Sequence, residues 1–145
     1  MPTVSDILQT KGSAVHNIDP NATVLEAIQK MNQHKLGALV VMAGGRVAGM
    51  FTERDVLVRV VGELRNPAET KVGEVMTSEV ICVPPQTDID EIGAIMQQRR
   101  IRHIPVCDED GTLHGMISIG DVNAFHVTQQ ESQITFLNDY IYGRA

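Results

Sequence analysis

Two seven-residue segments of this chain carry a hydroxyl and a carboxylate at the same spacing. Residues 49–55 read Gly-Met-Phe-Thr-Glu-Arg-Asp, and residues 115–121 read Gly-Met-Ile-Ser-Ile-Gly-Asp. We expect each segment at a junction between a strand and a helix. A carboxylate there, Asp55 or Asp121, can accept two hydrogen bonds from a ribose diol, as an acidic residue does in dinucleotide-binding folds.

The hydroxyls of the two segments suit a phosphate. Thr52 and Ser118 can donate to a phosphate beside the free N–H groups at the start of a helix. The same spacing also makes an ordinary capping box, so capping and ligand contact both stay open for Asp55 and Asp121. Arg54 can reach a phosphate or pair with an acidic neighbour, and the sequence does not decide between these roles.

A basic cluster at residues 99–103 suits the same anion. Arg102 and His103 enter a short apolar run, and we expect them to neutralise a phosphate. The arginines before them, including Arg99, also suit the end of a helix, where cations favour the helix dipole, or a solvated face.

These groups belong to two copies of one repeat. Residues 24–31 match residues 89–96 at a shift of 65, and one inserted residue changes the shift to 66 where 49–55 meets 115–121. The second copy has Arg102 and His103 where the first has Gly and Ala, so we expect two clefts of unequal character.

The local patterns predict the same elements in each copy. A capping box opens a helix with one apolar face, at Thr23 and Glu26 in the first copy and at Thr87 and Asp90 in the second. A short buried strand, a turn, a second strand and another helix follow. One copy alone cannot bury all its apolar faces, so we predict an α/β fold of two units related by a pseudo-two-fold axis.

Four segments follow along the chain. We expect the first repeat with its lead-in at 1–61, a connector at 62–71, the second repeat at 72–127 and a terminal helix at 128–145.

Composition excludes several functions. A net charge of −6 in 145 residues, with no Trp, argues against nucleic acid as a partner. The pattern predicts no membrane span, no secretory signal and a cytoplasmic protein. Cys82 and Cys107 form no CxxC pair and are expected to be buried, and the five His lack metal-ligand spacing. No catalytic motif is present, so we predict no enzyme, catalytic residue, bound metal or obligatory cofactor.

The repeat resembles the CBS domain pair, or Bateman module, of stand-alone bacterial signal-transduction proteins. The resemblance covers residues 4–125 and rests on Gly-x-x-Thr/Ser-x-x-Asp at 49–55 and 115–121, and on Arg-His-Ile-Pro-Val at 102–106. It implies two clefts between the copies that bind AMP first, then ATP or ADP, NAD or S-adenosylmethionine. It also implies a homodimer.

The resemblance suggests which residues would contact such a ligand. The apolar residues of this set would sandwich an adenine, although they also suit a plain strand core. The full set is Asp121, Ser118, Arg102, His103, Asp55, Thr52, Arg54, Ile81, Val83, Ile18 and Pro105.

The function expected is sensing of energy or redox state, with a signal passed to an effector protein that the sequence does not name. The alternative is a structural dimerisation module whose clefts are vestigial.

Overall fold

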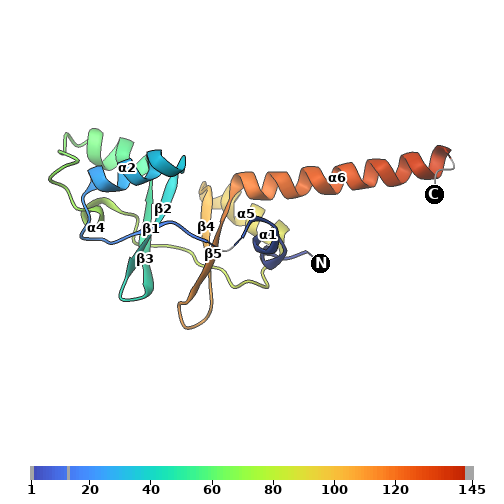
Figure 1. Ribbon diagram of the computed structural model, residues 1–145, viewed down its shortest axis with the longest axis horizontal. Coiled ribbons are helices and arrows are strands. Elements are labelled where there is room, and N and C mark those ends of the chain that lie inside the picture. Colours follow the sequence, from blue (N-terminus) through green and yellow to red (C-terminus); the bar gives the residue numbers. More distant parts are fainter. Residues whose placement is uncertain (1, 13, 143–145) are drawn as a thin grey trace.

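Each half of the chain folds as helices on a small sheet, and a long helix projects away from the second half (Figure 1). The structure is a computed structural model and describes residues 2–12 and 14–142. The first half contains β1 (Asn17–Ile18), α2 (Val24–His34), β2 (Ala38–Ala43), β3 (Arg46–Thr52), α3 (Glu53–Asp55) and the π-helix η1 (Val56–Val61). The second contains α5 (Ile89–Arg99), β4 (His103–Cys107), β5 (Leu113–Ser118) and α6 (Ile119–Tyr142). A short lead-in helix precedes each half, α1 (Val4–Lys11) and α4 (Val72–Val75).

The two sheets have equivalent pairings. In the first, β1 runs parallel to β2, and β2 and β3 form an antiparallel hairpin. Gly44 and Gly45 close that hairpin with φ of 60° and 77°, as a two-residue turn with two positive φ angles requires. In the second, β4 and β5 are antiparallel, and Val83 bridges Val106 in parallel where β1 lies in the first sheet. The α/β class and the repeated unit predicted from the sequence are confirmed.

The apolar helix faces predicted from the sequence form the two cores. In α2 the side chains of Val24, Ala27 and Met31 are buried, and they pack on β2 and β3. In α5 the equivalent residues, Ile89, Ile92 and Met96, are buried against β4 and β5.

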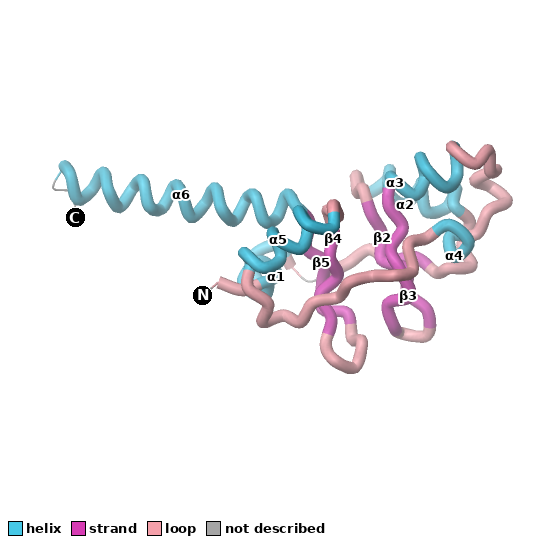
Figure 2. Tube along the Cα trace, turned by 180° about the vertical axis from the view of Figure 1, so that it is seen from behind, coloured by secondary structure: helices cyan, strands magenta, loops and turns pink. Residues whose placement is uncertain are grey.

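The two lead-in helices are exchanged between the halves. Val4, Ile7 and Leu8 of α1 are buried in the core of the second half, and the Val4 N–H donates to the Thr87 carbonyl at 2.8 Å. Figure 2 shows α1 beside α5 and β5, and α4 at the other half. The sequence grouped each lead-in with the repeat it precedes. The exchange means that the halves cannot separate without exposing part of both cores.

Residues of α4 complete the exchange in the opposite direction. Val72 and Val75 are buried in the core of the first half, and the Val72 N–H donates to the Ala22 carbonyl at 2.9 Å.

One of the two predicted helix caps is wrong. The cap of α2 is confirmed, because the Glu26 N–H donates to the Thr23 hydroxyl oxygen at 3.1 Å. The N-cap of α5 is Asp88 instead of Thr87, whose hydroxyl donates to the Pro84 carbonyl at 2.8 Å. A shift of 65 residues places Asp88, not Thr87, opposite Thr23, so the alignment of the two repeats is consistent with Asp88 as the N-cap.

The burial predicted for the two cysteines is confirmed for Cys107 and wrong for Cys82, which is exposed. Cys82 directly precedes Val83, whose side chain takes the buried side of this extended segment.

The C-terminal tail is not a separate helix. We expected a new element at residue 128, but α6 runs unbroken from Ile119 to Tyr142. No Gly or Pro occurs between Asp121 and Tyr142 to interrupt it. Residues 143–145 of the predicted terminal helix lie outside the described residues. Within the described ranges, no helix combines the length and hydropathy needed to cross a bilayer.

The glycine that opens each motif is needed for the exchanged helices to approach. A Cβ on Gly49 would lie 2.6 Å from the carbonyl oxygen of Thr77, which follows α4. A Cβ on Gly115 would lie 2.6 Å from Leu8 Cδ2 of α1. A backbone carbonyl can move away from a new methyl group less easily than the end of a side chain can. Position 49 therefore tolerates a methyl group less well than position 115.

We therefore expect Gly49→Ala to lower the free energy of unfolding by about 1–3 kcal/mol, and Gly115→Ala by less. Urea denaturation measures both changes. Gly93→Ala on α5 is the matched control, because its nearest contact is at 3.8 Å and a helical alanine is favoured by about 0.5–1 kcal/mol. Equal midpoints for Gly49→Ala and Gly93→Ala would contradict the close approach.

Candidate functional site

Both motifs line one continuous cleft between the two halves. Its volume is 1640 Å³, above the roughly 300–1,000 Å³ typical of small-molecule sites. The ends of β3 and β5 and the starts of β4 and α6 contribute to its walls. The two separate clefts expected from the resemblance are therefore joined in this structure.

Seven of the eleven predicted ligand contacts line this cleft. They are Thr52, Arg54, Asp55, Ile81, Arg102, His103 and Ser118. Asp121 lies beside it, with its N–H bonded to the Ser118 hydroxyl at 3.1 Å.

Ile18, Val83 and Pro105 lie elsewhere among the described residues. Ile18 pairs with Val41 in the first sheet and is buried in its core. Val83 is buried in the second core, and Pro105 is buried in β4. The plain strand-core interpretation left open by the sequence therefore fits Ile18 and Val83, whereas Ile81 is the member of the apolar set that faces the cleft.

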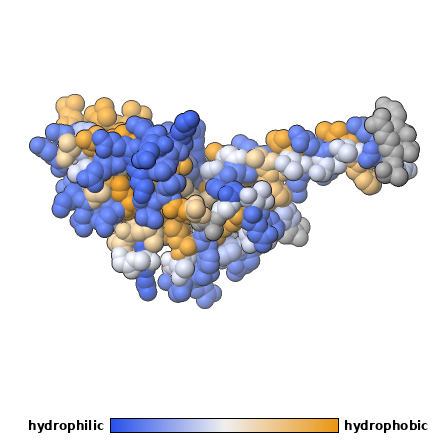
Figure 3. All heavy atoms as spheres, viewed as in Figure 1, coloured by the Kyte–Doolittle hydropathy of each residue, from blue (hydrophilic) through white to orange (hydrophobic). Residues whose placement is uncertain are grey.

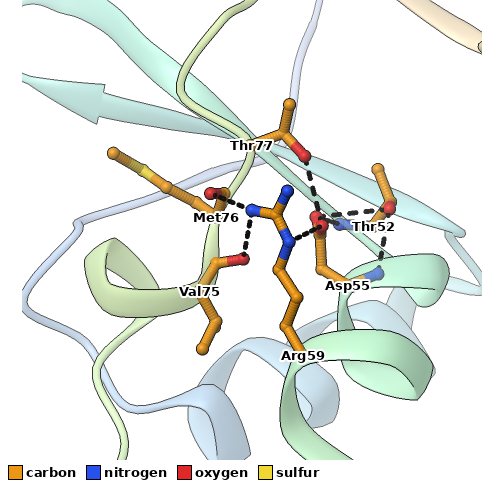
Figure 4. A network of polar contacts seen from close by, with 6 residues as sticks. All are labelled: Thr52, Asp55, Arg59, Val75, Met76 and Thr77. Carbon is orange, nitrogen blue, oxygen red and sulfur yellow. Dashed lines mark hydrogen bonds and ion pairs between the residues drawn. The ribbon is translucent and has the colours of Figure 1, made fainter. Parts of the chain in front are cut away.

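The carboxylate of Asp55 is held entirely by the protein (Figure 4). Oδ2 accepts hydrogen bonds from the Thr52 N–H at 3.0 Å and from the Thr52 hydroxyl at 3.3 Å. Oδ1 accepts from the Thr77 hydroxyl at 3.1 Å and lies 3.8 Å from Arg59 Nε. With Asp55 only 5% exposed, little of this carboxylate is open to a ligand.

Arg59 fastens this network to α4. Its Nη1 donates to the carbonyl of Met76 at 2.8 Å and to that of Val75 at 3.3 Å. The sequence patterns did not point to Arg59 or Thr77. The spacing of Arg59 four residues after Asp55 on a helix was the one available signal, whereas Thr77 reaches Asp55 only through the exchange of lead-in helices.

The carboxylate of Asp121 keeps one oxygen available. Oδ2 accepts hydrogen bonds from the Ser118 N–H at 2.8 Å and from Lys11 Nζ at 2.7 Å. Oδ1 accepts none from the described residues, and the side chain is 21% exposed. Burial raises the pKa of Asp121, but the bonds from Lys11 and Ser118 and the Lys11 charge outweigh it, so the pKa is lowered. Asp121 is therefore ionised at neutral pH.

The capping alternative is confirmed for both motifs, but the two carboxylates differ in what else they contact. Lys11, another residue that the sequence did not single out, comes from α1 and also donates to the Met116 carbonyl at 2.9 Å. The exchanged helices thus give one motif a buried network with Thr77 and the other an accessible ion pair with Lys11.

Positive charge is concentrated in the cleft. Five of the twelve Lys and Arg residues of the chain line it, but only four of the eighteen Asp and Glu residues. The cations are Arg54, Arg59, Arg99, Arg100 and Arg102, and the acids are Glu53, Asp55, Glu79 and Asp90. An acidic chain that gathers its arginines in a concave site has the electrostatics of an anion site.

His103 is a neutral group in this cleft. Burial is the main cause that lowers its pKa, and the positive charges of Lys11 and Arg102 act in the same direction. The charges of Glu53 and Asp121 oppose the shift without reversing it. We expected His103 to neutralise a phosphate, but at neutral pH it can offer a hydrogen bond and carries no charge.

A tandem α/β module with a ligand-sized cleft between its halves defines a class of regulatory binding domain. The family model for the CBS domain matches residues 4–62 and 72–125. The chain belongs to the CBS domain family and contains a pair of these domains, a family known for regulatory ligand binding.

Three known proteins illustrate the similarity. The mitochondrial CBS domain-containing protein CBSX3 of Arabidopsis thaliana is 39% identical over 97% of this chain and 72% of its own length. CBS domain-containing protein YhcV of Bacillus subtilis is 30% identical over 93% of this chain and 95% of its own. A solved structure, a putative signal-transduction protein with CBS domains from Burkholderia ambifaria, superimposes with a TM-score of 0.84 at 39% identity and covers 89% of this chain and 96% of its own.

Proposed function

We propose that this CBS pair binds an adenine nucleotide in the inter-unit cleft and signals its occupancy to a partner protein, without catalysing a reaction. The observation that carries the proposal is the accessible carboxylate of Asp121 at a cleft in which arginines gather. A free carboxylate oxygen suits a ribose hydroxyl, and guanidinium groups suit phosphate.

The proposed contacts involve residues of the second motif and of the cleft wall around it. Asp121 would accept from the ribose through Oδ1 while Lys11 and Ser118 hold Oδ2. Arg102 would bind a phosphate, and neutral His103 would donate a hydrogen bond from the cleft wall. Ile81, half-buried at the same wall, would contact the base.

The nucleotide would occupy the second motif, because the Asp55 carboxylate is buried and already surrounded by Thr52, Thr77 and Arg59. The cleft volume accommodates a mononucleotide such as AMP, ADP or ATP and also a dinucleotide such as NAD. S-adenosylmethionine carries a ribose but no phosphate, so it would use Asp121 and offer the arginines only its single carboxylate.

Thermal denaturation of the purified chain with each of these ligands tests the proposal. A ligand at about 100 times its Kd stabilises by roughly 2.7 kcal/mol, which raises the Tm by several degrees. We expect at least one nucleotide to give this shift and Arg102→Met to weaken its binding about 10-fold or more, because a bond to a charged group contributes about 1.5–3 kcal/mol.

Arg46→Met is the matched control for Arg102→Met. Arg46 is an exposed arginine at the start of β3, packed near the Gly111 turn and outside the described lining of the cleft. An equal loss of nucleotide affinity in both variants would show that only net charge matters. No rise in Tm with any of the ligands would contradict the proposal.

A structural dimerisation module is the second candidate. Apolar side chains are exposed along α6, where Figure 3 shows hydrophobic colour on the projecting helix. Phe136 is 70% exposed and Ile141 is 67% exposed, and Glu131 and Asp139 are the charged residues between 127 and 142. Low charge lets identical helices pair without repulsion. If no nucleotide binds and sedimentation shows a dimer that Leu137→Glu dissociates, this function replaces the first.

A further inference from the structure

Lys11 links the second motif to the exchanged helix α1. Its Nζ donates to Asp121 Oδ2 at 2.7 Å and to the Met116 carbonyl at 2.9 Å. Lys11 lies in the last turn of α1, and Ile7 and Leu8 of the same helix are buried in the core of the second half. The ammonium group therefore reaches the motif from a helix that is held in place by packing.

Lys11 is placed to hold the Asp121 carboxylate in one orientation. Oδ2 accepts hydrogen bonds from Lys11 and from the Ser118 N–H, whereas Oδ1 accepts none from the described residues. Lys11 is outside the described lining of the cleft. Its effect on a molecule in the cleft would therefore act through Asp121 and not through direct contact.

We propose that Lys11 is a positioning residue for the nucleotide, because it orients the Asp121 carboxylate so that Oδ1 meets the ribose diol. This inference rests on the proposed function above. A carboxylate that already has the required orientation loses less conformational freedom when a ligand binds. By thermodynamic linkage, a nucleotide at Asp121 strengthens the Lys11 contact by the same factor, and with it the docking of α1.

The charges around Asp121 support this role. Burial is the largest single cause and raises the pKa of Asp121, but the bond and charge of Lys11 and the hydrogen bonds of Ser118 outweigh it, so the pKa is lowered. Without Lys11, the pKa of Asp121 should rise. The other charged and titratable side chains at this corner of the cleft are His103, Arg102 and Glu53.

A double-mutant cycle on the full chain tests the proposal. Isothermal titration with AMP, ADP, ATP and NAD at neutral pH gives the affinities. Lys11→Met should weaken nucleotide binding about 3- to 5-fold, as expected for the loss of a partly exposed ion pair. In the Asp121→Asn background the same change should have no further effect, because the carboxylate that Lys11 positions is absent. Lys11→Arg keeps the charge and the donors, and it should restore most of the affinity.

A titration of the ligand-free chain gives a readout that a purely structural role would not move. Carbon-13 NMR follows the Asp121 carboxyl group, whose pKa should rise in Lys11→Met and stay lowered in Lys11→Arg. Lys30→Met is the matched control, because Lys30 on α2 also donates to a backbone carbonyl, that of Asn17, but forms no ion pair among the described residues. This control should leave both the pKa of Asp121 and the affinity unchanged.

Three results would overturn the proposal. The first is a pKa of Asp121 that Lys11→Met does not change, and the second is an affinity that Lys11→Met does not change. The third is an equal loss from Lys11→Met in the wild-type and Asp121→Asn backgrounds, which would mean that Lys11 contacts the nucleotide directly. Nucleotide binding that is independent of Lys11 removes this inference alone, whereas a wild-type chain that binds none of the four nucleotides removes the proposed function with it.

Discussion

Asp55→Ala is expected to lower the free energy of unfolding by about 2–4 kcal/mol, a large share of the stability of a domain this size. The change removes the carboxylate at the centre of the network and leaves the Thr52 N–H and the Thr77 hydroxyl without this acceptor. It also frees Arg59, which links η1 to the carbonyls after α4. Urea denaturation followed by circular dichroism measures the loss.

Two comparisons isolate the network. Thr77→Val removes one hydrogen bond and should cost about 1 kcal/mol. Asp121→Ala removes a capping residue and a partly exposed ion pair, for which about 1 kcal/mol is expected. If Asp55→Ala and Asp121→Ala cost the same, the buried network does not distinguish the two motifs.

Nucleotide affinity, unlike stability, is expected to depend on Asp121 more than on Asp55. Asp121→Asn should weaken binding of the nucleotide about 10- to 100-fold while the chain stays folded, because the amide preserves the shape of the cap but loses the charge that favours a ribose hydroxyl. Isothermal titration at neutral pH measures the change. An unchanged affinity would place the ribose away from the second motif.

Asp90→Asn is the matched control for charge. The Asp90 carboxylate also lines the cleft, but its side chain is 82% exposed and lies 3.8 Å from His126 Nε2 instead of holding a cap. Removing this negative charge should leave affinity unchanged or raise it slightly. A loss equal to that of Asp121→Asn would mean that the effect is not specific to the ribose contact.

Local pattern was sufficient to predict most of the fold. Apolar periodicity predicted α2 and α5, short apolar runs predicted β2 and β4, and repeated motifs predicted that the two halves share one architecture. These features depend on residues near one another in the chain. The cap at Asp88 was missed because Thr87 was matched to Thr23 by residue type, although the 65-residue shift pairs Thr23 with Asp88. The unbroken α6 was missed because nothing in the sequence marks where a helix leaves its domain.

The sequence alone also predicted several of the polar residues found at the cleft. It placed Thr52 and Asp55 in one motif and Ser118 and Asp121 in the other, and it identified Arg102 and His103 as the polar entry to β4. The sequence could not predict which of the two carboxylates is accessible to a ligand, because both motifs have the same spacing and both form a cap.

The tertiary structure determines which carboxylate is buried and which is accessible. The exchange of lead-in helices brings Thr77 to Asp55 and Lys11 to Asp121, across sequence separations of 22 and 110 residues. The Asp55 carboxylate is thereby buried, with hydrogen bonds to both of its oxygens, whereas Oδ1 of Asp121, beside the cleft, accepts no hydrogen bond from the described residues. Periodicity and motif spacing report on neighbours along the chain, whereas burial and charge depend on which distant segments pack together, and only the folded chain determines that.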